Sequence, residues 1–411
     1  MRCKYICLRE AYDYIEIGNK DNNLSCKEVE SINKYLESKY KNKKIIDFKI
    51  NKIRFINYTG IIALDDLVIE ILPKISLTDD ENNDRKMLIK MLTLCNKLPI
   101  NIEQSNSIST DKNNLLEILC KIFIENLENE IKKGLHLEYI SESENINTLK
   151  GKLLLKEHIH KNYSNKSKAY CKYDSYSCDN FLNQILKYTC NLLVGKINDE
   201  KIDIKIKKIL KIFSDVSTIS VSKEKMNNFK FNRQNERFKL VFEIAKLILN
   251  NESSKNSYGN KNAFSLLYEM NVLYEEYIGR LVSCVYSGEN RRVKLQDSSN
   301  YLLTKINLDK TKVKLKPDIV LYDNGKANLI IDTKWKSINY RQPDIYQMYA
   351  YINGYKDSKR CILLYPKLDD NDKIPIWKVE SEDKYIELRN VRLDNIDNTL
   401  DDLKNIIYKG N

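Results

Sequence analysis

Apolar positions along the chain change their spacing several times, and each change predicts a different kind of element. Short β-rich runs predict strands around residues 48–55 and a hairpin whose strands, residues 60–64 and 67–72, end at Pro73. Apolar residues at helical spacing predict a group of helices over residues 26–40, 86–98, 114–133, 182–192, 204–213 and 238–249. The first half of the chain is therefore expected to be β-rich at its N-terminus and helical in its middle.

A second hairpin pattern, at residues 315–336, has acidic residues near its ends. Two apolar runs flank the turn residues Asp323-Asn324-Gly325. Because residues i and i+2 share one face of a strand, Asp332 and Lys334 point together, opposite a largely apolar face. Asp318 joins them if the loop has three residues or if a bulge has the same effect, whereas a regular two-residue loop turns it away.

Two helices are predicted beside this hairpin. In residues 264–277 a buried stripe contains Tyr274, and Glu275 is the acid nearest its edge. In the second helix, which begins near Pro343 and ends at Gly354, Gln347 and Tyr351 share one face. A strand at residues 361–365 follows. The order helix, strand, strand, helix, strand predicts a mixed sheet flanked by helices, so the fold class is mixed α/β or α+β.

The hairpin carries the groups that a metal-dependent phosphodiesterase needs. Asp318, Asp332 and the main-chain carbonyl of Thr333 offer hard oxygen ligands suited to Mg²⁺. Lys334 can orient a water molecule and stabilise charge on the phosphorane. Glu275 is expected to assist the metal directly or through water.

The same residues also have non-catalytic interpretations. Asp/Glu-x-Lys triplets recur elsewhere, as at Glu130-x-Lys132, because lysine is abundant, so the acids can be ordinary surface ion-pair partners. Glu275 can be a solvated glutamate. Gln347 and Tyr351 either contact DNA, brace the lysine, or have a neutral surface role.

Length and polar loops suggest the domain organisation. A chain of 411 residues is long enough for two or three domains. Polar stretches at residues 161–168 and 250–262 predict an N-terminal domain over residues 1–160 and a second domain over residues 161–411, with a helical subdomain at 161–255 and a catalytic core at 256–411.

Composition excludes some classes of protein and favours others only weakly. The net charge of +12 suits a polyanionic partner, but lysine is dispersed along the whole chain, as on an ordinary solvated surface. Without a long apolar run or an export signal, the chain is expected in the cytoplasm, away from membranes. No phosphate-binding loop of the Gly-x-x-x-x-Gly-Lys-Ser/Thr type occurs.

Cysteine and histidine usage argues against a structural zinc site. Ten cysteines without any Cys-x-x-Cys pair are expected to be reduced thiols. His158 and His160 are expected on one strand face, where no third ligand completes a tetrahedral set.

Taken together, these residues resemble a known nuclease superfamily. Pro317-Asp318 with Asp332-Thr333-Lys334 resembles the PD-(D/E)xK motif, and Gln347-x-x-x-Tyr351 is similar to its RecB-like branch. The chain also resembles McrC, the nuclease subunit of McrBC-type modification-dependent (5-methylcytosine) restriction systems, in short segments at residues 60–74, 134–135, 149–152, 177–187 and 270–275. It departs from that pattern at Lys150, where arginine is expected, and at Tyr274, where phenylalanine is usual.

The resemblance implies a machine with two kinds of subunit. The partner would be an McrB-like AAA+ GTPase ring that uses GTP and recognises modified double-stranded DNA. The N-terminal part of this chain would dock with the ring and stimulate the GTPase, and the C-terminal part would cut DNA with Mg²⁺. Two alternatives stay open: a non-cleaving subunit that activates the GTPase and positions DNA, and a stand-alone RecB-like repair nuclease.

Overall fold

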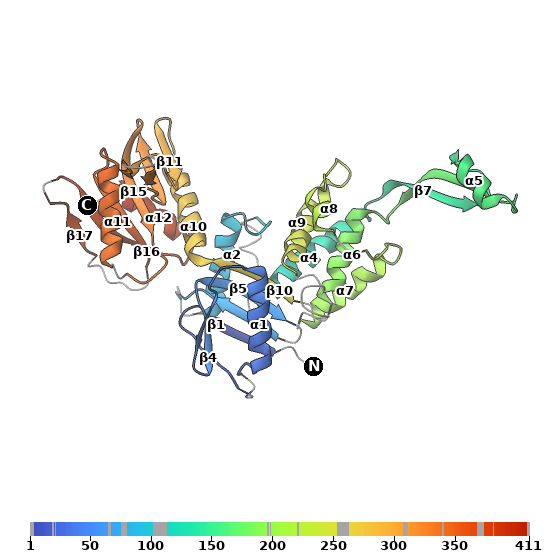
Figure 1. Cartoon of the computed structure of the whole chain (residues 1–411), viewed down its shortest axis with the longest axis horizontal. Coiled ribbons are helices and arrows are strands. Elements are labelled where there is room, and N and C mark those ends of the chain that lie inside the picture. The colour runs from blue at the N-terminus through green and yellow to red at the C-terminus, as the bar shows by residue number, and fades with distance from the viewer. Residues whose placement is uncertain are drawn as a thin grey trace. The chain divides into compact units, whose positions relative to one another are not determined.

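The computed structural model describes residues 4–18, 20, 22–64, 67–74, 80–101, 113–194, 197, 199–219, 222–252, 263–306, 311–338, 341–367, 374–380 and 382–408. The chain forms two compact units (Figure 1). One comprises residues 3–115 and 253–411, and the other comprises residues 116–252. Among the described residues, no helix is both long and apolar enough to cross a membrane.

The N-terminal part of the first unit is built on a four-stranded sheet. Its strands lie in the order β1 (Lys4–Arg9), β6 (Leu67–Leu72), β5 (Tyr58–Leu64) and β10 (Ala263–Glu269). The predicted hairpin is confirmed, because β5 and β6 pair antiparallel. Helix α1 (Cys26–Lys39) is also confirmed and begins with a capping box between Ser25 and Glu28. A smaller sheet, β2 (Ile15–Glu16), β4 (Lys52–Phe55) and β3 (Ile46–Lys49), shares the same hydrophobic core.

Residues 264–269 form a strand, so the prediction of one helix over residues 264–277 was wrong in its first half. Strand β10 pairs along its whole length with β5, and this ladder outweighs the helical spacing of its apolar residues. Gly60 permits the close approach, since a Cβ atom there would lie 1.9 Å from the carbonyl oxygen of Leu266. The chain thus returns to the N-terminal sheet immediately before helix α10 (Met270–Val285).

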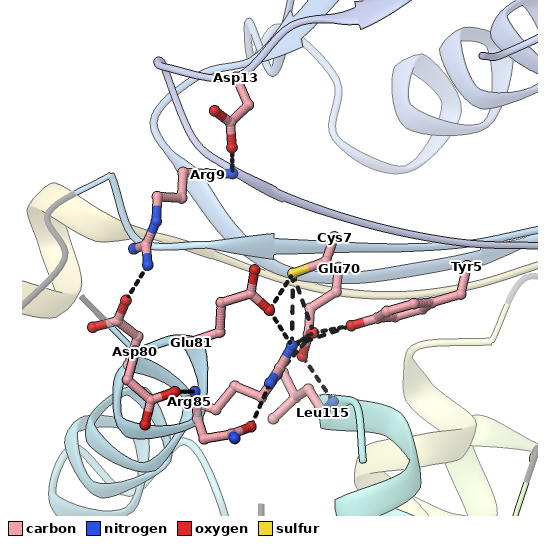
Figure 2. Close-up of polar contacts among 11 residues, drawn as sticks. Tyr5, Cys7, Arg9, Asp13, Glu70, Asp80, Glu81, Arg85 and Leu115 are labelled. Carbon is pink, nitrogen blue, oxygen red and sulfur yellow. Dashed lines mark hydrogen bonds and ion pairs between the residues drawn. The ribbon is translucent and has the colours of Figure 1, made fainter. Parts of the chain in front are cut away.

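A buried polar network centres on Glu70 of this sheet (Figure 2). Glu70 on β6 accepts hydrogen bonds from the hydroxyl of Tyr5 and from Arg85 Nε (2.9 Å), which lies on α2 (Glu81–Leu94). Its other oxygen accepts from the amide of Leu115 (3.0 Å), the first residue of α4 (Leu115–Ile131). One carboxylate therefore neutralises a buried guanidinium and satisfies an unpaired amide at a helix N-terminus.

The second unit combines a helical core with a three-stranded sheet. Besides α4, apart from its first residue, and α5 (Leu155–Asn162), its described helical elements are α6 (Phe181–Leu193), α7 (Glu200–Ile212), α8 (Lys223–Asn227), η1 (Glu236–Phe238) and α9 (Lys239–Asn250). In the sheet, β7 (Glu138–Ile146) and β8 (Lys152–Leu153) both pair with β9 (Ala169–Ser177). Residues 161–162 end helix α5 and residues 163–168 connect it to β9, so this polar stretch lies inside one compact unit. The compact units divide instead at 115/116 and 252/253.

His158 and His160 were expected on one strand face, but the structure does not place them on a strand. Both belong to helix α5 (Leu155–Asn162). His158 Nδ1 lies 2.9 Å from the side-chain nitrogen of Asn162 and accepts a hydrogen bond from the amide of Tyr170 (3.3 Å). His158 therefore fastens the helix to β9.

The C-terminal part of the first unit contains a six-stranded mixed sheet. Its order is β11 (Arg291–Leu295), β14 (Ile319–Asp323), β15 (Lys326–Thr333), β16 (Arg360–Pro366), β18 (Tyr385–Val391) and β17 (Ile376–Lys378). Strands β12 (Tyr301–Thr304) and β13 (Lys312–Lys314) form a separate ribbon. Helix α11 (Gln342–Gly354) packs on one face through Met348, Tyr351 and Ile352. Helices α10 and α12 (Ile396–Tyr408) pack together, against β15 and β18 respectively. The expected mixture of sheets and helices is confirmed.

Replacement of Glu70 by alanine is expected to lower the free energy of unfolding by about 3–5 kcal/mol, because Arg85 would be left buried without its counter-charge. Glu81, which is mostly exposed and also pairs with Arg85, provides the matched control. Glu81→Ala is expected to cost about 0–1 kcal/mol. Urea unfolding of both variants measures the difference, and equal costs would contradict the central role of Glu70.

Candidate active site

The β14–β15 hairpin brings the predicted acids to one face through a bulge, one of the two arrangements that the sequence allowed. The loop itself has two residues, Asn324 (φ 50°) and Gly325 (φ 80°), and not three. The ladder shifts by one residue between the pairs Tyr322–Ala327 and Leu321–Leu329, which leaves Asn328 as a bulge. Beyond the bulge Ile319 pairs with Ile331. The next position along the ladder sets Asp318 opposite Asp332, on the same face.

Asp318 is held across the hairpin by Thr333. The amide and hydroxyl of Thr333 both donate to Asp318 Oδ2, at 2.7 and 2.8 Å. The carbonyl of Asp318 accepts from the amide of Gln296 (2.7 Å), so its backbone is also tied to the strand on its other side. The carboxylate is therefore oriented before any ligand arrives.

Asp332 and Lys334 form a buried ion pair at the end of β15. The side chain of Asp332 is almost fully buried, and its Oδ2 atom lies 2.6 Å from Lys334 Nζ. Burial and the neighbouring charge of Asp318 raise the pKa of Asp332 to about 7, against the opposing effect of Lys334. Burial disfavours the charge of Lys334, but Asp332 outweighs this effect and the pKa of Lys334 is raised. Lys334 therefore carries a firmly held positive charge.

Gln347 and Tyr351 form a chain of hydrogen bonds behind this lysine. Lys334 Nζ donates to Gln347 Oε1 (3.2 Å), and Gln347 Nε2 donates to the hydroxyl of Tyr351 (2.8 Å). That hydroxyl donates to the carbonyl of Lys316 (3.0 Å), two residues before Asp318. The chain fixes the orientation of the Gln347 amide, and this is the arrangement expected of residues that brace the lysine.

Glu275 lies near the acids without joining them directly. Gln296 Nε2 donates to Glu275 Oε1 (2.7 Å), and burial followed by the charge of Asp318 raises the pKa of Glu275. Gln296 thus ties Glu275 to the backbone of Asp318. The backbone of Gln296 is left-handed (φ 47°). Sequence reasoning missed Gln296, because no local motif reveals that β11 ends opposite Asp318.

The donor set fits a hard divalent cation at the two aspartates. Asp318 and Asp332 present carboxylate oxygens whose mutual repulsion a cation would relieve. Among the described residues, however, no group of three or more His, Cys, Asp or Glu side chains is arranged to hold a metal ion. Glu275 is therefore not assembled with the two aspartates as a third direct ligand, and a role for it through water suits this geometry better.

Sequence comparison connects the chain with one kind of restriction system. The family model for the McrBC 5-methylcytosine restriction system component matches residues 53–366. The type IV methyl-directed restriction enzyme EcoKMcrBC of Escherichia coli K12 is 23% identical over 288 residues, which cover 65% of this chain and 81% of that protein.

Two solved structures from Thermococcus gammatolerans share the fold. A chain in a refined half-complex from a tetradecameric assembly of McrB AAA+ hexamers with bound McrC matches with a TM-score of 0.75 and 20% identity, over 98% of this chain and 100% of that chain. A chain in the cryo-EM structure of the McrBC complex matches with a TM-score of 0.55 and 22% identity, over 69% and 89% of the two chains.

Replacement of Asp332 by asparagine is expected to raise the thermal unfolding midpoint in metal-free buffer at pH 8, and to raise it less at pH 5. The folded chain keeps the Asp332 proton to about pH 7, whereas an unfolded aspartate loses it near pH 4. Ionisation therefore costs stability increasingly as the pH rises through this window, and asparagine avoids that cost. Differential scanning calorimetry at both pH values measures it, with exposed Asp357→Asn as the control. A loss of stability at pH 8 would contradict the account.

Proposed function

The chain belongs to the family of McrBC 5-methylcytosine restriction system components, and from this premise we propose that it is the DNA-cleaving subunit of such a system. In this proposal it is a PD-(D/E)xK endonuclease that requires Mg²⁺. It hydrolyses phosphodiester bonds of modified double-stranded DNA in the cytoplasm, and it stimulates the GTPase of its partner.

The grouping of three charged side chains at one end of a hairpin is the main support for this function. Asp318, Asp332 and Lys334, which are separated in the sequence, meet at one end of the β14–β15 hairpin, with a positive charge 2.6 Å from the more buried acid. An ordinary surface ion pair does not need two acids on one face, burial of one of them, and a second layer of hydrogen bonds behind the lysine. Perturbed carboxylates of this kind are typical of sites that bind metal or move protons.

The side chains divide the chemistry among them. Mg²⁺ would be held by Asp318, Asp332 and the carbonyl of Thr333, where it would lower the pKa of a bound water molecule and polarise the phosphate. Lys334, firmly protonated, donates hydrogen bonds and cannot serve as the base. It orients the attacking water and stabilises charge on the phosphorane. Glu275 assists through water, while Gln347 and Tyr351 keep Lys334 in place.

A partner is proposed from the structural neighbours. The matched chains come from assemblies that contain McrB AAA+ hexamers with McrC. We propose that this chain likewise binds an McrB-like AAA+ GTPase ring, which supplies GTP hydrolysis and recognition of modified DNA. The sequence has no phosphate-binding loop of its own, which suits that division. Residues before Met270 would dock with the ring. Residues from Met270 onward, which include the β14–β15 hairpin, would cut DNA.

Alanine at Lys334 is expected to reduce cleavage of methylated DNA by about a hundredfold or more, because the charge that stabilises the phosphorane is lost. Asp332→Ala is expected to abolish cleavage. Both variants should still assemble with the GTPase and stimulate it. The assay combines the chain, the candidate GTPase, Mg²⁺ and GTP with methylated or unmethylated DNA.

Lys132→Ala is the matched control, because Lys132 belongs to a Glu-x-Lys triplet at the C-terminal end of helix α4, is exposed, and should be dispensable. Undiminished cleavage by Lys334→Ala would overturn the assignment of the site. GTPase stimulation without any cleavage by the unaltered chain would favour a non-cleaving subunit, and cleavage without the GTPase would favour a stand-alone nuclease.

A further inference from the structure

Trp335, which directly follows Lys334, makes a contact that the cleavage mechanism does not use. Its indole nitrogen donates a hydrogen bond of 2.8 Å to Oε1 of Glu10. Glu10 belongs to the N-terminal part of the chain, where its amide donates to the carbonyl of Leu72 (3.0 Å) at the end of β6. Residues 325 positions apart in the sequence are thus joined beside the candidate active site.

The segment that carries Lys334 is anchored on two sides. Lys334 and Lys336 are both held to helix α11, through Gln347 (3.2 Å) and Asp344 (2.6 Å) respectively. Trp335 lies between them in the sequence and is anchored to Glu10 instead. Its ring also packs on Tyr274, with centroids 5.4 Å apart, and Tyr274 directly precedes Glu275. Trp335 therefore touches both segments that bring charged groups to the site.

A buried carboxylate such as that of Glu10 is energetically unfavourable in a contact that only packs two parts of the chain together. The Glu10 side chain is fully buried, and no side chain donates a hydrogen bond to its second oxygen, Oε2. Burial raises the pKa of Glu10 and outweighs the opposing effects of the positive charge of Lys74, the indole hydrogen bond and the backbone amides of Lys74 and Asn57. A neutral acceptor would bind the indole without the cost of burying a carboxylate. This unfavourable choice suggests a role beyond stability.

We propose that Glu10 is a positioning residue of the nuclease site, which acts through Trp335 to hold Lys334 in register and so makes cleavage depend on the N-terminal part of the chain. The proposal rests on the cleavage function proposed above. Among the described residues, no hydrogen bond joins Glu10 to Asp318 or Asp332. It fixes Trp335, and the fixed indole confines the backbone of Lys334, whose amide donates to the carbonyl of Leu364 (2.9 Å).

The first test is hydrogen exchange in the full chain without DNA or partner. Trp335→Phe removes the donor but keeps a ring against Tyr274, and Glu10→Leu removes the acceptor. In both variants the amide of Lys334 should exchange faster than in the unaltered chain, as measured by mass spectrometry of peptides that span residues 329–338. Glu10→Gln, which keeps an acceptor, and Trp377→Phe, at the other tryptophan, should leave this exchange unchanged. Unaltered exchange in Trp335→Phe would overturn the proposal, whether or not the complex cuts DNA.

The second test separates positioning from simple loss of structure. In the complex with the GTPase, Trp335→Phe and Glu10→Leu should each lower kcat for DNA cleavage about tenfold or more, with KM for DNA unchanged. The double variant should lose no more than the worse single variant, because both remove one interaction. GTPase stimulation should be retained. Additive losses, or a kcat for Trp335→Phe equal to that of the unaltered chain, would overturn the proposal, and a fall in GTPase stimulation would reassign Glu10 to docking.

Discussion

The burial of Asp332 beside a second carboxylate is the constraint on which the rest of this site depends. Asp332 is only 2% exposed, and Lys334 is the cation in contact with it. Such an arrangement is costly without further support, because burial and a neighbouring like charge both disfavour the ionised form of Asp332. Hydrogen bonds from neighbouring residues offset part of that cost. Thr333 donates to Asp318, Gln347 accepts from Lys334, and Gln296 donates to Glu275. The site is thus prepared to accept a positive charge.

Local patterns predicted those features of the site that depend on neighbouring residues. The shared face of Asp332 and Lys334 follows from strand geometry, and helix α11 extends to Gly354, where its end was predicted. The bulge at Asn328 had no sequence signal, because the Asn324-Gly325 turn alone is compatible with a regular ladder. Gln296 was missed since its position depends on pairing between β11 and β14.

Elements with conflicting local signals were decided by tertiary contacts. Residues 264–269 have helical spacing, yet β5 offers them a complete ladder and they form β10. His158 and His160 were expected on a strand, but they lie in helix α5, which is fastened to β9 through His158. In both cases the partner segment lies elsewhere in the sequence, and pairing with it outweighs a weak intrinsic preference.

Two connections join the N-terminal part of the first unit to the part that contains the β14–β15 hairpin. Strand β10 completes the N-terminal sheet and leads directly into helix α10, which carries Glu275. The amide of Met270, the first residue of that helix, donates to the carbonyl of Asn57 (3.0 Å). Events at the N-terminal sheet therefore have a short covalent and hydrogen-bonded route to the acids.

In the proposed mechanism Asp332, whose pKa of about 7 leaves it partly protonated at neutrality, becomes a magnesium ligand. Calorimetric titration of the chain with Mg²⁺ at pH 7, in two buffers of different ionisation enthalpy, counts the protons released on binding. We expect the unaltered chain to release a substantial fraction of one proton and Asp332→Asn to release none. Magnesium binding without proton release, or equal release from both chains, would rule out this role of Asp332.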